Sequence, residues 1–441
     1  MEYQEGLSYL DSLQMHKIKL GLAAMRGFLD RVGSPEKGLR FVHVAGTNGK
    51  GSVSANLFSI AKQAGYRVGL YTSPHLSDVR ERFRLGDRFI SKDEFARLAT
   101  KIRGILEPDR ITYFEFGTAL ALLWFAENDV DLVVLEVGMG GRLDATNVVT
   151  PLISVITSIS MDHEAYLGTN LTQVAGEKAG IIKPGIPVVS SAVKPEAAAV
   201  VEQTCAERGA PLYLFGRDFG YRPEGDSWCW LGTRQPVAGE IAGLRCGLLG
   251  DYQRQNSSVA VAAALLLRQS GFSIDTLAIA AGVAQVSWPG RMEYFHGEKI
   301  PEPGQGGDPA GRWYLLDGAH NPDGVARLAE SLAVDFAGRR LVCVWGAMGD
   351  KDIAAAFAAI EPVVDRLILT RAPGERSATP EQLMDCLSPA GRARAVCEPD
   401  IRAALAMAGT LAGPDDCIVV AGSLYLLGEA RKMLRGEVVD G

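Results

Sequence analysis

HVAGTNGKGSVSANL, residues 43–57, joins a short apolar run to a longer segment with helical periodicity. A Gly-rich turn between a strand and a helix exposes successive backbone N–H groups, and the helix N-terminus adds its positive dipole end. In such a loop Lys50 would reach the β- and γ-phosphates of a nucleotide, and the Ser52 hydroxyl would bind Mg²⁺. The segment therefore predicts a phosphate-binding loop made of Gly46, Thr47, Asn48, Gly49, Lys50, Gly51 and Ser52.

This loop differs in two places from the common nucleotide-binding string G-x-x-x-x-G-K-[ST]. Val44 stands where the first Gly would be, and Gly51 separates Lys50 from the hydroxyl residue. An ordinary Gly-rich turn between a strand and a helix is the alternative interpretation. The apolar run before the loop, the helical segment after it and the GKGS string together favour a phosphate site.

Outside this loop, short β-branched runs alternate with longer helical periods, which is the pattern of a parallel α/β sheet. Strands are expected at Arg40–Ala45, Arg67–Thr72, Asp131–Val137, Leu152–Thr157 and Pro187–Ser190. Helices are expected at Ser52–Ala64, Lys92–Leu106, Phe116–Glu127, Leu171–Ile182, after Gly250 and near Asp275–Ala284. Runs such as LVVLEV are apolar almost throughout, as expected of strands that are covered on both faces.

Pro289 and Gly290 interrupt this pattern, and a second alternation of strands and helices follows them. Its strands are expected at Arg312–Leu316, Leu341–Trp345, Arg366–Thr370 and Cys417–Ala421. We therefore predict two doubly wound α/β domains. Residues 1–287 would form a parallel-sheet ATPase domain with the phosphate loop, and residues 288–441 a smaller Rossmann-like domain. The Gly/Pro-rich stretch Glu302–Gly311 is interpreted as a long exposed loop.

The composition of the 441 residues excludes several classes of protein. Lys and Arg number 45 against 52 Asp and Glu, and this net charge of −7 argues against a protein that grips nucleic acid. No apolar run approaches the ~20 residues of a membrane-spanning helix, and the N-terminus lacks a signal or transit pattern. The seven cysteines form no CxxC pair and fit reduced thiols, so a cytoplasmic enzyme is expected.

Two further side chains come at or just after the ends of strands in the first domain. Glu136 ends a buried strand, at the sheet edge where open α/β sheets bind ligands, and could bind Mg²⁺. A hydrogen-bonded buried Glu is the alternative. His163 alone would read as a surface or capping residue, and its place on the same edge favours a ligand, although Mg²⁺ prefers oxygen. A dinucleotide fingerprint is excluded at Gly138, because Leu143 stands where its third Gly is needed.

The remaining chemical candidates lie in one short helix and in the second domain. Lys178, next to Glu177, reads from the residues alone as part of a solvated Glu–Lys face. Asp317 and His320 follow a strand in a Gly-containing loop, and Arg291 lies beside the interdomain hinge. An Arg in that position could close over phosphates when the domains come together.

Ten segments in order along the chain carry a resemblance to a known family. They are GTNGKGS, SPHL, YFEFGTALA, GMGGRLDATN, MDHEAYLG, EKAGIIKPG, GDYQRQN, WPGRME, LDGAHNP and GSLYLLGE. Together they resemble the folylpolyglutamate synthase/dihydrofolate synthase family of Mur-ligase-type, ATP-dependent amide ligases. The RLDAT string is similar to that of bifunctional bacterial members, so both the folylpolyglutamate synthase and the dihydrofolate synthase activity are expected.

The resemblance implies a role for each matching position. It implies ATP contacts by the phosphate loop, Asn256, Arg291 and Asp317, and magnesium ligands at Ser52, Glu136 and His163. It implies that Lys178 is carbamylated for a second Mg²⁺, and that K⁺ or another monovalent cation takes part. The catalytic residues would be Lys50, Lys178 and His320. Folate or pteroate would contact Ser73, Pro74, His75, Arg82 and Asp144, and glutamate would contact His320 and Ser423.

The implied reaction activates a carboxylate with ATP as an acyl phosphate, which the amine of L-glutamate then attacks. The partners would be small molecules, with no nucleic acid and no membrane, and a monomer is expected. Folylpolyglutamate synthase activity alone is the first alternative. A cell-wall Mur ligase is another, although only about 45 residues precede Gly46, too few for the domain that such enzymes carry there. A nucleotide-driven switch protein is a third alternative, and it would leave the strand-end cluster of the second domain without a role.

Overall fold

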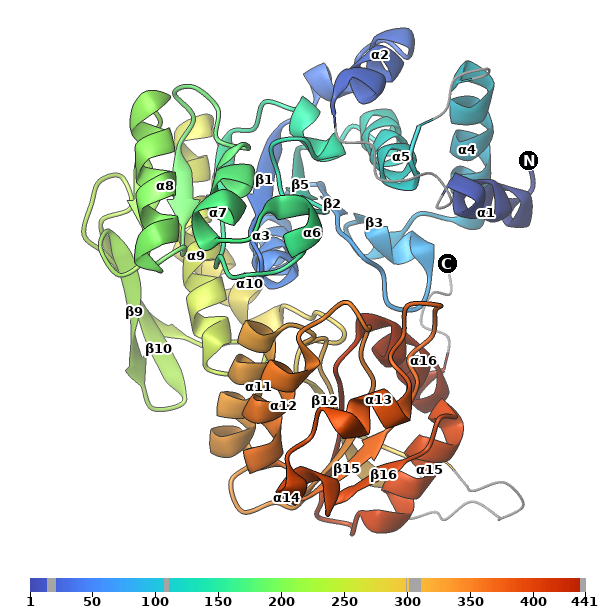
Figure 1. Cartoon of the computed structure of the whole chain (residues 1–441). Helices are drawn as coiled ribbons and strands as arrows, with labels where there is room; N and C mark the ends of the chain where they lie inside the picture. The colour runs from blue at the N-terminus through green and yellow to red at the C-terminus, as the bar shows by residue number, and fades with distance from the viewer. Residues whose placement is uncertain (14–20, 107–110, 299, 301–310, 437–441) are drawn as a thin grey trace.

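The computed structural model of the chain describes residues 1–13, 21–106, 111–298, 300 and 311–436. Two α/β bodies lie one above the other in Figure 1, the first formed by the N-terminal part of the chain and the second by the C-terminal part. The predicted long loop Glu302–Gly311 lies outside the described residues apart from Gly311. No helix among the described residues is long and apolar enough to cross a membrane.

The first body is built on an eight-stranded sheet whose strand order is β4-β3-β2-β5-β1-β6-β7-β8. All strands from β2 to β8 in this order run parallel, whereas β3 and β4 add an antiparallel edge to the sheet. The sheet is therefore mixed, where the sequence predicts a parallel one. The strands are β1 (Phe41–Ala45), β2 (Val68–Tyr71), β3 (Phe83–Leu85), β4 (Arg88–Phe89), β5 (Leu132–Glu136), β6 (Ile153–Ile156), β7 (Val188–Ser190) and β8 (Leu212–Leu214).

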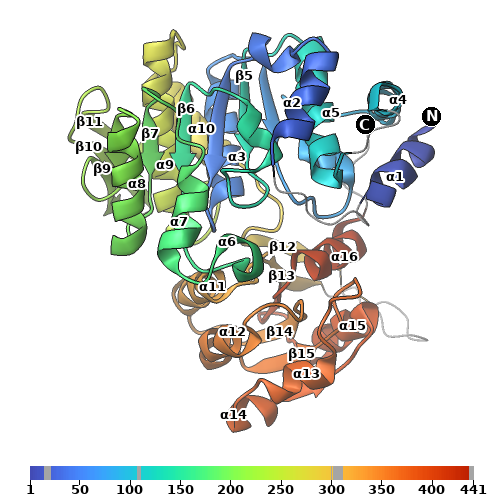
Figure 2. The same ribbon diagram turned by 45° about the horizontal axis from the view of Figure 1, so that its top comes forward.

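Helices cover both faces of this sheet, which is why its central strands are apolar on both sides (Figure 2). One face packs against α3 (Lys50–Gln63), α9 (Tyr252–Leu267) and α10 (Thr276–Gln285). The other packs against α4 (Lys92–Leu106), α5 (Tyr113–Glu127), α7 (Leu171–Ala179) and α8 (Pro195–Glu207), with α1 (Tyr3–Ser12) and α2 (Ala23–Arg31) outside them.

A small antiparallel sheet beside α9 is not predicted from the sequence. It consists of β9 (Phe219–Glu224), β10 (Ser227–Gly232) and β11 (Gly239–Leu244). Trp228 and Trp230 are buried in the core that α9 shares, and the Trp230 indole donates a hydrogen bond to Ser258 O at 3.1 Å. This sheet therefore extends the first body without touching the edge where ligands are expected.

The second body contains a six-stranded sheet of order β12-β13-β17-β14-β15-β16, parallel except for β12. Its strands are β12 (Glu293–Gly297), β13 (Arg312–Leu316), β14 (Leu341–Trp345), β15 (Arg366–Leu369), β16 (Ala395–Cys397) and β17 (Cys417–Ala421). Its helices are α11 (Pro322–Asp335), α12 (Ile353–Ile360), α13 (Pro380–Asp385), α14 (Pro389–Arg392), α15 (Ile401–Leu411) and α16 (Leu424–Arg435). The predicted α/β fold class is confirmed, and the domain boundary near residue 287 stays a prediction, which the position of α10 before it and β12 after it supports.

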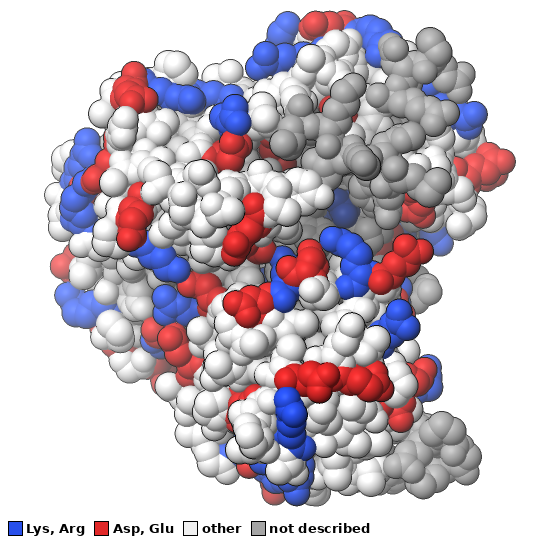
Figure 3. Space-filling model, in the orientation of Figure 1, with Lys and Arg blue, Asp and Glu red and all other residues white. Residues whose placement is uncertain are grey.

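Charge on the face drawn in Figure 3 is mixed. Acidic and basic side chains are interspersed over the described residues there, with no continuous basic surface of the kind that nucleic-acid backbones require. Figure 3 shows a recess between the two bodies. The candidate site is a cavity lined by residues of both bodies.

Candidate active site

The candidate site is a cavity of about 400 Å³ between the two bodies. The strand register places the carboxyl ends of β1, β5 and β6 side by side, because Val44 pairs with Glu136 and Ala45 with Ile156. The loops that follow these strands line the cavity from the first body, and the loops after β13, β14 and β17 line it from the second. Ligands bind at this edge of open α/β sheets.

The phosphate loop has the predicted geometry, with residues 46–49 between β1 and the start of α3 at Lys50. Gly49 has φ 87°, a left-handed conformation that favours Gly, and a Cβ there would lie 2.5 Å from Asn256 Oδ1. A Cβ at Gly51 would lie 2.8 Å from Trp288 Nε1. The extra Gly in the loop therefore makes room for the indole of the hinge segment, a contact that the sequence pattern does not reveal.

Lys50 and Lys178 both donate to the carbonyl of Gly46, at 3.2 and 2.9 Å, and Lys50 also donates to Thr47 O at 3.0 Å. Burial lowers the pKa of Lys50, and the carboxylate of Glu136 works in the opposite direction. Burial, followed by repulsion from Lys50, lowers the pKa of Lys178 to about 7. Lys178 is only 3% exposed, so its interpretation as part of a solvated face is wrong.

The side chains of Ser52, Glu136 and His163 line the same cavity. Glu136 Oε2 accepts a hydrogen bond from Ser73 N at 3.1 Å, and burial raises the pKa of this carboxyl. The described residues contain no cluster of three or more His, Cys, Asp or Glu side chains able to hold a metal ion by themselves. One hydroxyl, one carboxylate and one imidazole fit an ion that takes its other ligands from water and a nucleotide phosphate, as Mg²⁺ does.

The second body contributes the predicted residues Arg291, Asp317, His320 and Ser423 to the cavity. Asp317 accepts hydrogen bonds from Met292 N and Ala319 N, both at 2.9 Å, and so joins the hinge segment to the loop after β13. His320 Nδ1 lies 2.8 Å from Gly318 O, which places the proton on Nδ1 and leaves Nε2 as the acceptor nitrogen, 3.8 Å from Asp162 Oδ2. Burial lowers the pKa of His320 to about 4, so its ring is neutral near pH 7.

The residues predicted for folate divide into two groups. Ser73 and Pro74 line the cavity, whereas His75, Arg82 and Asp144 do not. His75 Nδ1 accepts from Arg82 Nε at 2.9 Å. Asp144 is buried and accepts from Met139 N at 2.9 Å and Thr146 N at 3.0 Å, which makes it a cap of the turn around it. Contact of these three residues with folate stays a prediction.

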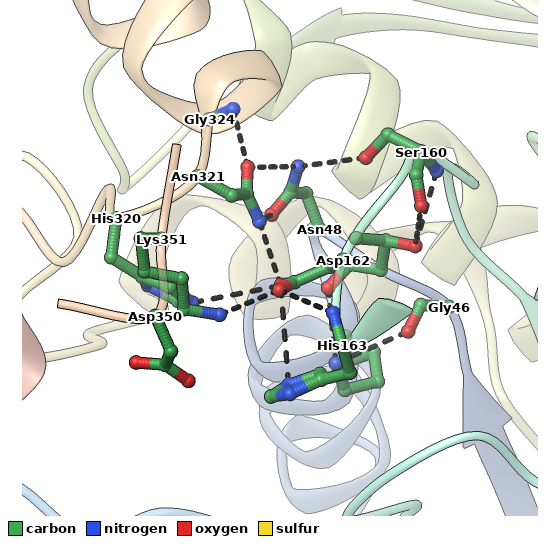
Figure 4. A network of polar contacts seen from close by, with 12 residues as sticks. Gly46, Asn48, Ser160, Asp162, His163, His320, Asn321, Gly324, Asp350 and Lys351 are labelled. Carbon is green, nitrogen blue, oxygen red and sulfur yellow. Dashed lines mark hydrogen bonds and ion pairs between the residues drawn. The ribbon is translucent and has the colours of Figure 1, made fainter. Parts of the chain in front are cut away.

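Asp162 and Lys351 also line the cavity, and the sequence argument did not select them. Their side chains meet across the two bodies, with Lys351 Nζ 2.6 Å from Asp162 Oδ1 (Figure 4). Burial acts to raise the pKa of Asp162, but His163 and Lys351 outweigh it and hold the pKa below its ordinary range. Asp162 precedes His163 after β6 and Lys351 follows the end of β14, so position after a strand was the available signal.

Comparison with known proteins agrees with this geometry. Residues 44–264 match the Mur ligase middle domain, and residues 290–424 match the Mur ligase glutamate ligase domain. The dihydrofolate synthase/folylpolyglutamate synthase of Bacillus subtilis is 34% identical, over 98% of this chain and 99% of the relative. This chain belongs to the folylpolyglutamate synthase/dihydrofolate synthase family of Mur ligases.

Solved structures of similar proteins match this chain over nearly its whole length. The Escherichia coli FolC structure in complex with DHPP and ADP has a TM-score of 0.86 at 31% identity, covering 98% of this chain and 97% of that one. The Mycobacterium tuberculosis folylpolyglutamate synthase complexed with ADP and AMPPCP has the same TM-score at 30% identity, with full coverage of both chains. The related Yersinia pestis enzyme, 30% identical and covering 98% of both chains with a TM-score of 0.84, was solved with AMPPNP and Mn ion. These complexes indicate that enzymes of this family take a nucleotide and a divalent metal.

Proposed function

We propose that this chain is an ATP-dependent ligase that adds L-glutamate to folates and also to 7,8-dihydropteroate. The observation that carries the proposal is the single cavity in which a phosphate loop from one body faces Arg291, Asp317 and His320 from the other. A ligase must bring nucleotide, acceptor and amine together and exclude water, and a site shared by two domains meets that need.

In the proposed reaction, an oxygen of the acceptor carboxylate attacks the γ-phosphorus of ATP and ADP leaves. The amine nitrogen of glutamate then attacks the acyl carbon, the C–O bond to phosphate breaks, and the released phosphate takes up the proton that the amine loses. The backbone of the phosphate loop and Lys50 offset charge on the transferring group, and Arg291 closes over it from the hinge. His320 offers its Nε2 lone pair to the incoming amine and orients it.

Mg²⁺, held by Ser52, Glu136 and His163 when bound, would neutralise charge on the phosphates. We propose that Lys178 is carbamylated and serves a second divalent ion. Its amine is buried among phosphate-loop atoms, and within the described part of the chain its one hydrogen-bond acceptor is the carbonyl of Gly46. Carbamylation would turn this cation into a carboxylate next to the nucleotide. Intact-protein mass measured with and without bicarbonate tests it. K⁺ or another monovalent cation is proposed on the family resemblance, and activity in K⁺ against Na⁺ buffers tests that part.

The acceptor range is tested by phosphate release from purified protein with MgATP and L-glutamate. Release with both 7,8-dihydropteroate and tetrahydrofolate is the expected result. Release with tetrahydrofolate alone would favour the second candidate, a folylpolyglutamate synthase without dihydrofolate synthase activity. That candidate has a specific observation behind it, since the Lacticaseibacillus casei folylpolyglutamate synthase is 33% identical over 99% of both chains. Release with neither acceptor would contradict the proposal.

We also propose that the ligase works as a monomer in the cytoplasm. Both halves of the cavity come from one chain, so catalysis needs no second copy. All seven cysteines are free thiols, as a reducing compartment maintains them. Light scattering of the purified protein tests the oligomeric state, and fractionation of cells that express it tests the compartment.

A further inference from the structure

Two asparagine side chains form a reciprocal pair across the two bodies, between the phosphate loop and the start of α11 (Figure 4). Asn321 Nδ2 donates to Asn48 Oδ1 at 3.0 Å, and Asn48 Nδ2 donates to Asn321 Oδ1 at 3.2 Å. Asn48 belongs to the phosphate loop of the first body. Asn321 directly follows His320 in the second body and is 2% exposed. The pair therefore joins the ATP side of the cavity to the side that we assign to glutamate.

The neighbours of the pair determine the orientation of both amides. Gly324 N donates to Asn321 Oδ1 at 2.8 Å, so the oxygen of that amide must face the helix backbone. Asp323 Oδ2 accepts from Asn48 Nδ2 at 3.1 Å, and a carboxylate can only accept. Each amide thus presents its remaining group to the other, and neither can flip without losing a fixed partner.

Asp162, in the first body, is hydrogen-bonded to the pair through Asn321. Its Oδ2 accepts from Asn321 Nδ2 at 3.1 Å, and its Oδ1 accepts from Lys351 Nζ at 2.6 Å. One buried carboxylate therefore holds two separate loops of the second body, those after β13 and after β14. Lys194 adds a third connection by reaching Asp323 at 3.0 Å. Charge-assisted bonds between buried groups are the stronger hydrogen bonds in proteins.

We propose that Asn48, Asn321 and Asp162 form an interdomain latch that keeps the second body seated on the phosphate loop while the acyl group passes to the amine. These are positioning residues, because they act by holding the bodies together and placing His320. The inference rests on the proposed function. With the latch open, water reaches the acyl carbon and the C–O bond to phosphate breaks by hydrolysis. The acceptor carboxylate is then regenerated and ATP is consumed without amide formation.

The test exploits the second role of Asn321 as the N-cap of α11. Asn321→Asp keeps an oxygen for Gly324 N but removes the Nδ2 donor and places a carboxylate next to Asp162. We expect the phosphate released per amide formed, and the KM for glutamate, each to rise about tenfold or more, as loss of a charge-assisted bond implies. Asn321→Ser keeps a capping hydroxyl without the new charge and should act in the same direction.

Asn170→Asp is the matched control. Asn170 caps α7 in the same way, with its Oδ1 accepting from Gln173 N at 3.0 Å, so the same change of charge is made at a helix N-cap outside the latch. We expect this variant to keep the phosphate-to-amide ratio of the parent. An equal rise in the control would show that a carboxylate at a helix cap causes the effect, and would overturn the proposal.

Asn321→Asp combined with Asp162→Asn restores a donor and an acceptor in exchanged positions. The latch predicts that the phosphate released per amide formed by this double variant is at least about tenfold lower than the product of the two single effects would give. Multiplicative effects, or a ratio within about twofold of the parent for both Asn321 variants, would overturn the latch. Small-angle scattering with AMPPNP reports the closed state independently of activity, and the Asn321 variants should be expanded. If the parent forms no amide but the Asn321 variants are still expanded, the proposed function is refuted and the latch is not.

Discussion

Two lysines that share one carbonyl define the chemistry of this ligase at the scale of single residues. The Nζ atoms of Lys50 and Lys178 both lie within hydrogen-bond distance of Gly46 O, so two like charges converge at the start of the phosphate loop. Burial lowers the pKa of both lysines, and repulsion from Lys50 lowers the pKa of Lys178 further. A bound anion would relieve that repulsion, and so would the proposed carbamylation of Lys178, which replaces one of the two cations by an anion.

His43, in β1 directly before the loop, provides a prediction about pH. It is fully buried, with Nε2 2.8 Å from Thr146 Oγ1, and burial lowers its pKa to about 3. An unfolded His titrates near ~6.5, so between that pH and about 3 the unfolded chain binds a proton that the folded chain does not. Stability present above pH 6.5 is therefore lost as the pH falls, by up to about 1.4 kcal/mol per pH unit for this group.

His43→Gln should remove that contribution. Urea unfolding at several pH values between 7 and 4 measures it, and the variant should lose less free energy of unfolding than the parent over this range. Equal slopes for the two proteins would contradict the assignment of a neutral, buried imidazole.

The sequence reveals site residues that lie on one sheet, but not those that meet only because the two bodies dock. Glu136 ends a strand and Ser52 and His163 follow other strands of the same sheet, so the parallel topology alone predicts that they share an edge. Asp162 and Lys351 lie at equivalent positions in different bodies, and their ion pair exists only because those bodies meet. A single-chain pattern carries no information about that docking.

At the scale of elements, a comparison of predicted and observed bounds shows which helices and strands the local sequence pattern predicts. The expected strands Arg312–Leu316, Leu341–Trp345 and Cys417–Ala421 and the helix Lys92–Leu106 have the observed bounds. Helix α5 begins at Tyr113, three residues before the predicted start, because Thr112 and Glu115 form a capping box. The small sheet β9–β11 was missed because its strands contain Pro and Gly and lack regular alternation.

Helix α16 provides a prediction in which packing and helix propensity have opposite signs. A Cβ at Gly428 would lie 2.0 Å from Leu76 O, a backbone atom of the SPHL loop in the first body. Gly to Ala inside a helix normally stabilises by about 0.5–1 kcal/mol. Here Gly428→Ala should destabilise by about 1–3 kcal/mol, because the loop must move away from the helix.

Gly27 and Gly104 are the controls, since a Cβ at either meets nothing within 4 Å. They lie in α2 and α4, and their Ala variants should be neutral or more stable. Thermal unfolding of the three variants checks the prediction. Stabilisation by Gly428→Ala would show that the SPHL loop does not dock on α16 as described.

For the whole molecule, the arrangement of two bodies around one cavity explains why chemical motifs lie on both sides of Pro289. The first body supplies the phosphate loop and the side chains that we propose bind Mg²⁺, and the second supplies the residues that we propose meet glutamate. The relative position of the two bodies depends on contacts at the cavity, such as Lys351 with Asp162, and also on the packing of α16 against the SPHL loop. A molecule bound in this cavity would therefore contact residues of both bodies.

The central claim is that a carboxylate is activated as an acyl phosphate and then captured by glutamate. Its most direct test uses a folate acceptor whose reacting carboxylate carries ¹⁸O at both oxygens, incubated with MgATP and L-glutamate. If the carboxylate is phosphorylated, the released phosphate will carry one labelled oxygen for each amide formed, and ADP will be the nucleotide product. Unlabelled phosphate, or label found in AMP, would contradict the account.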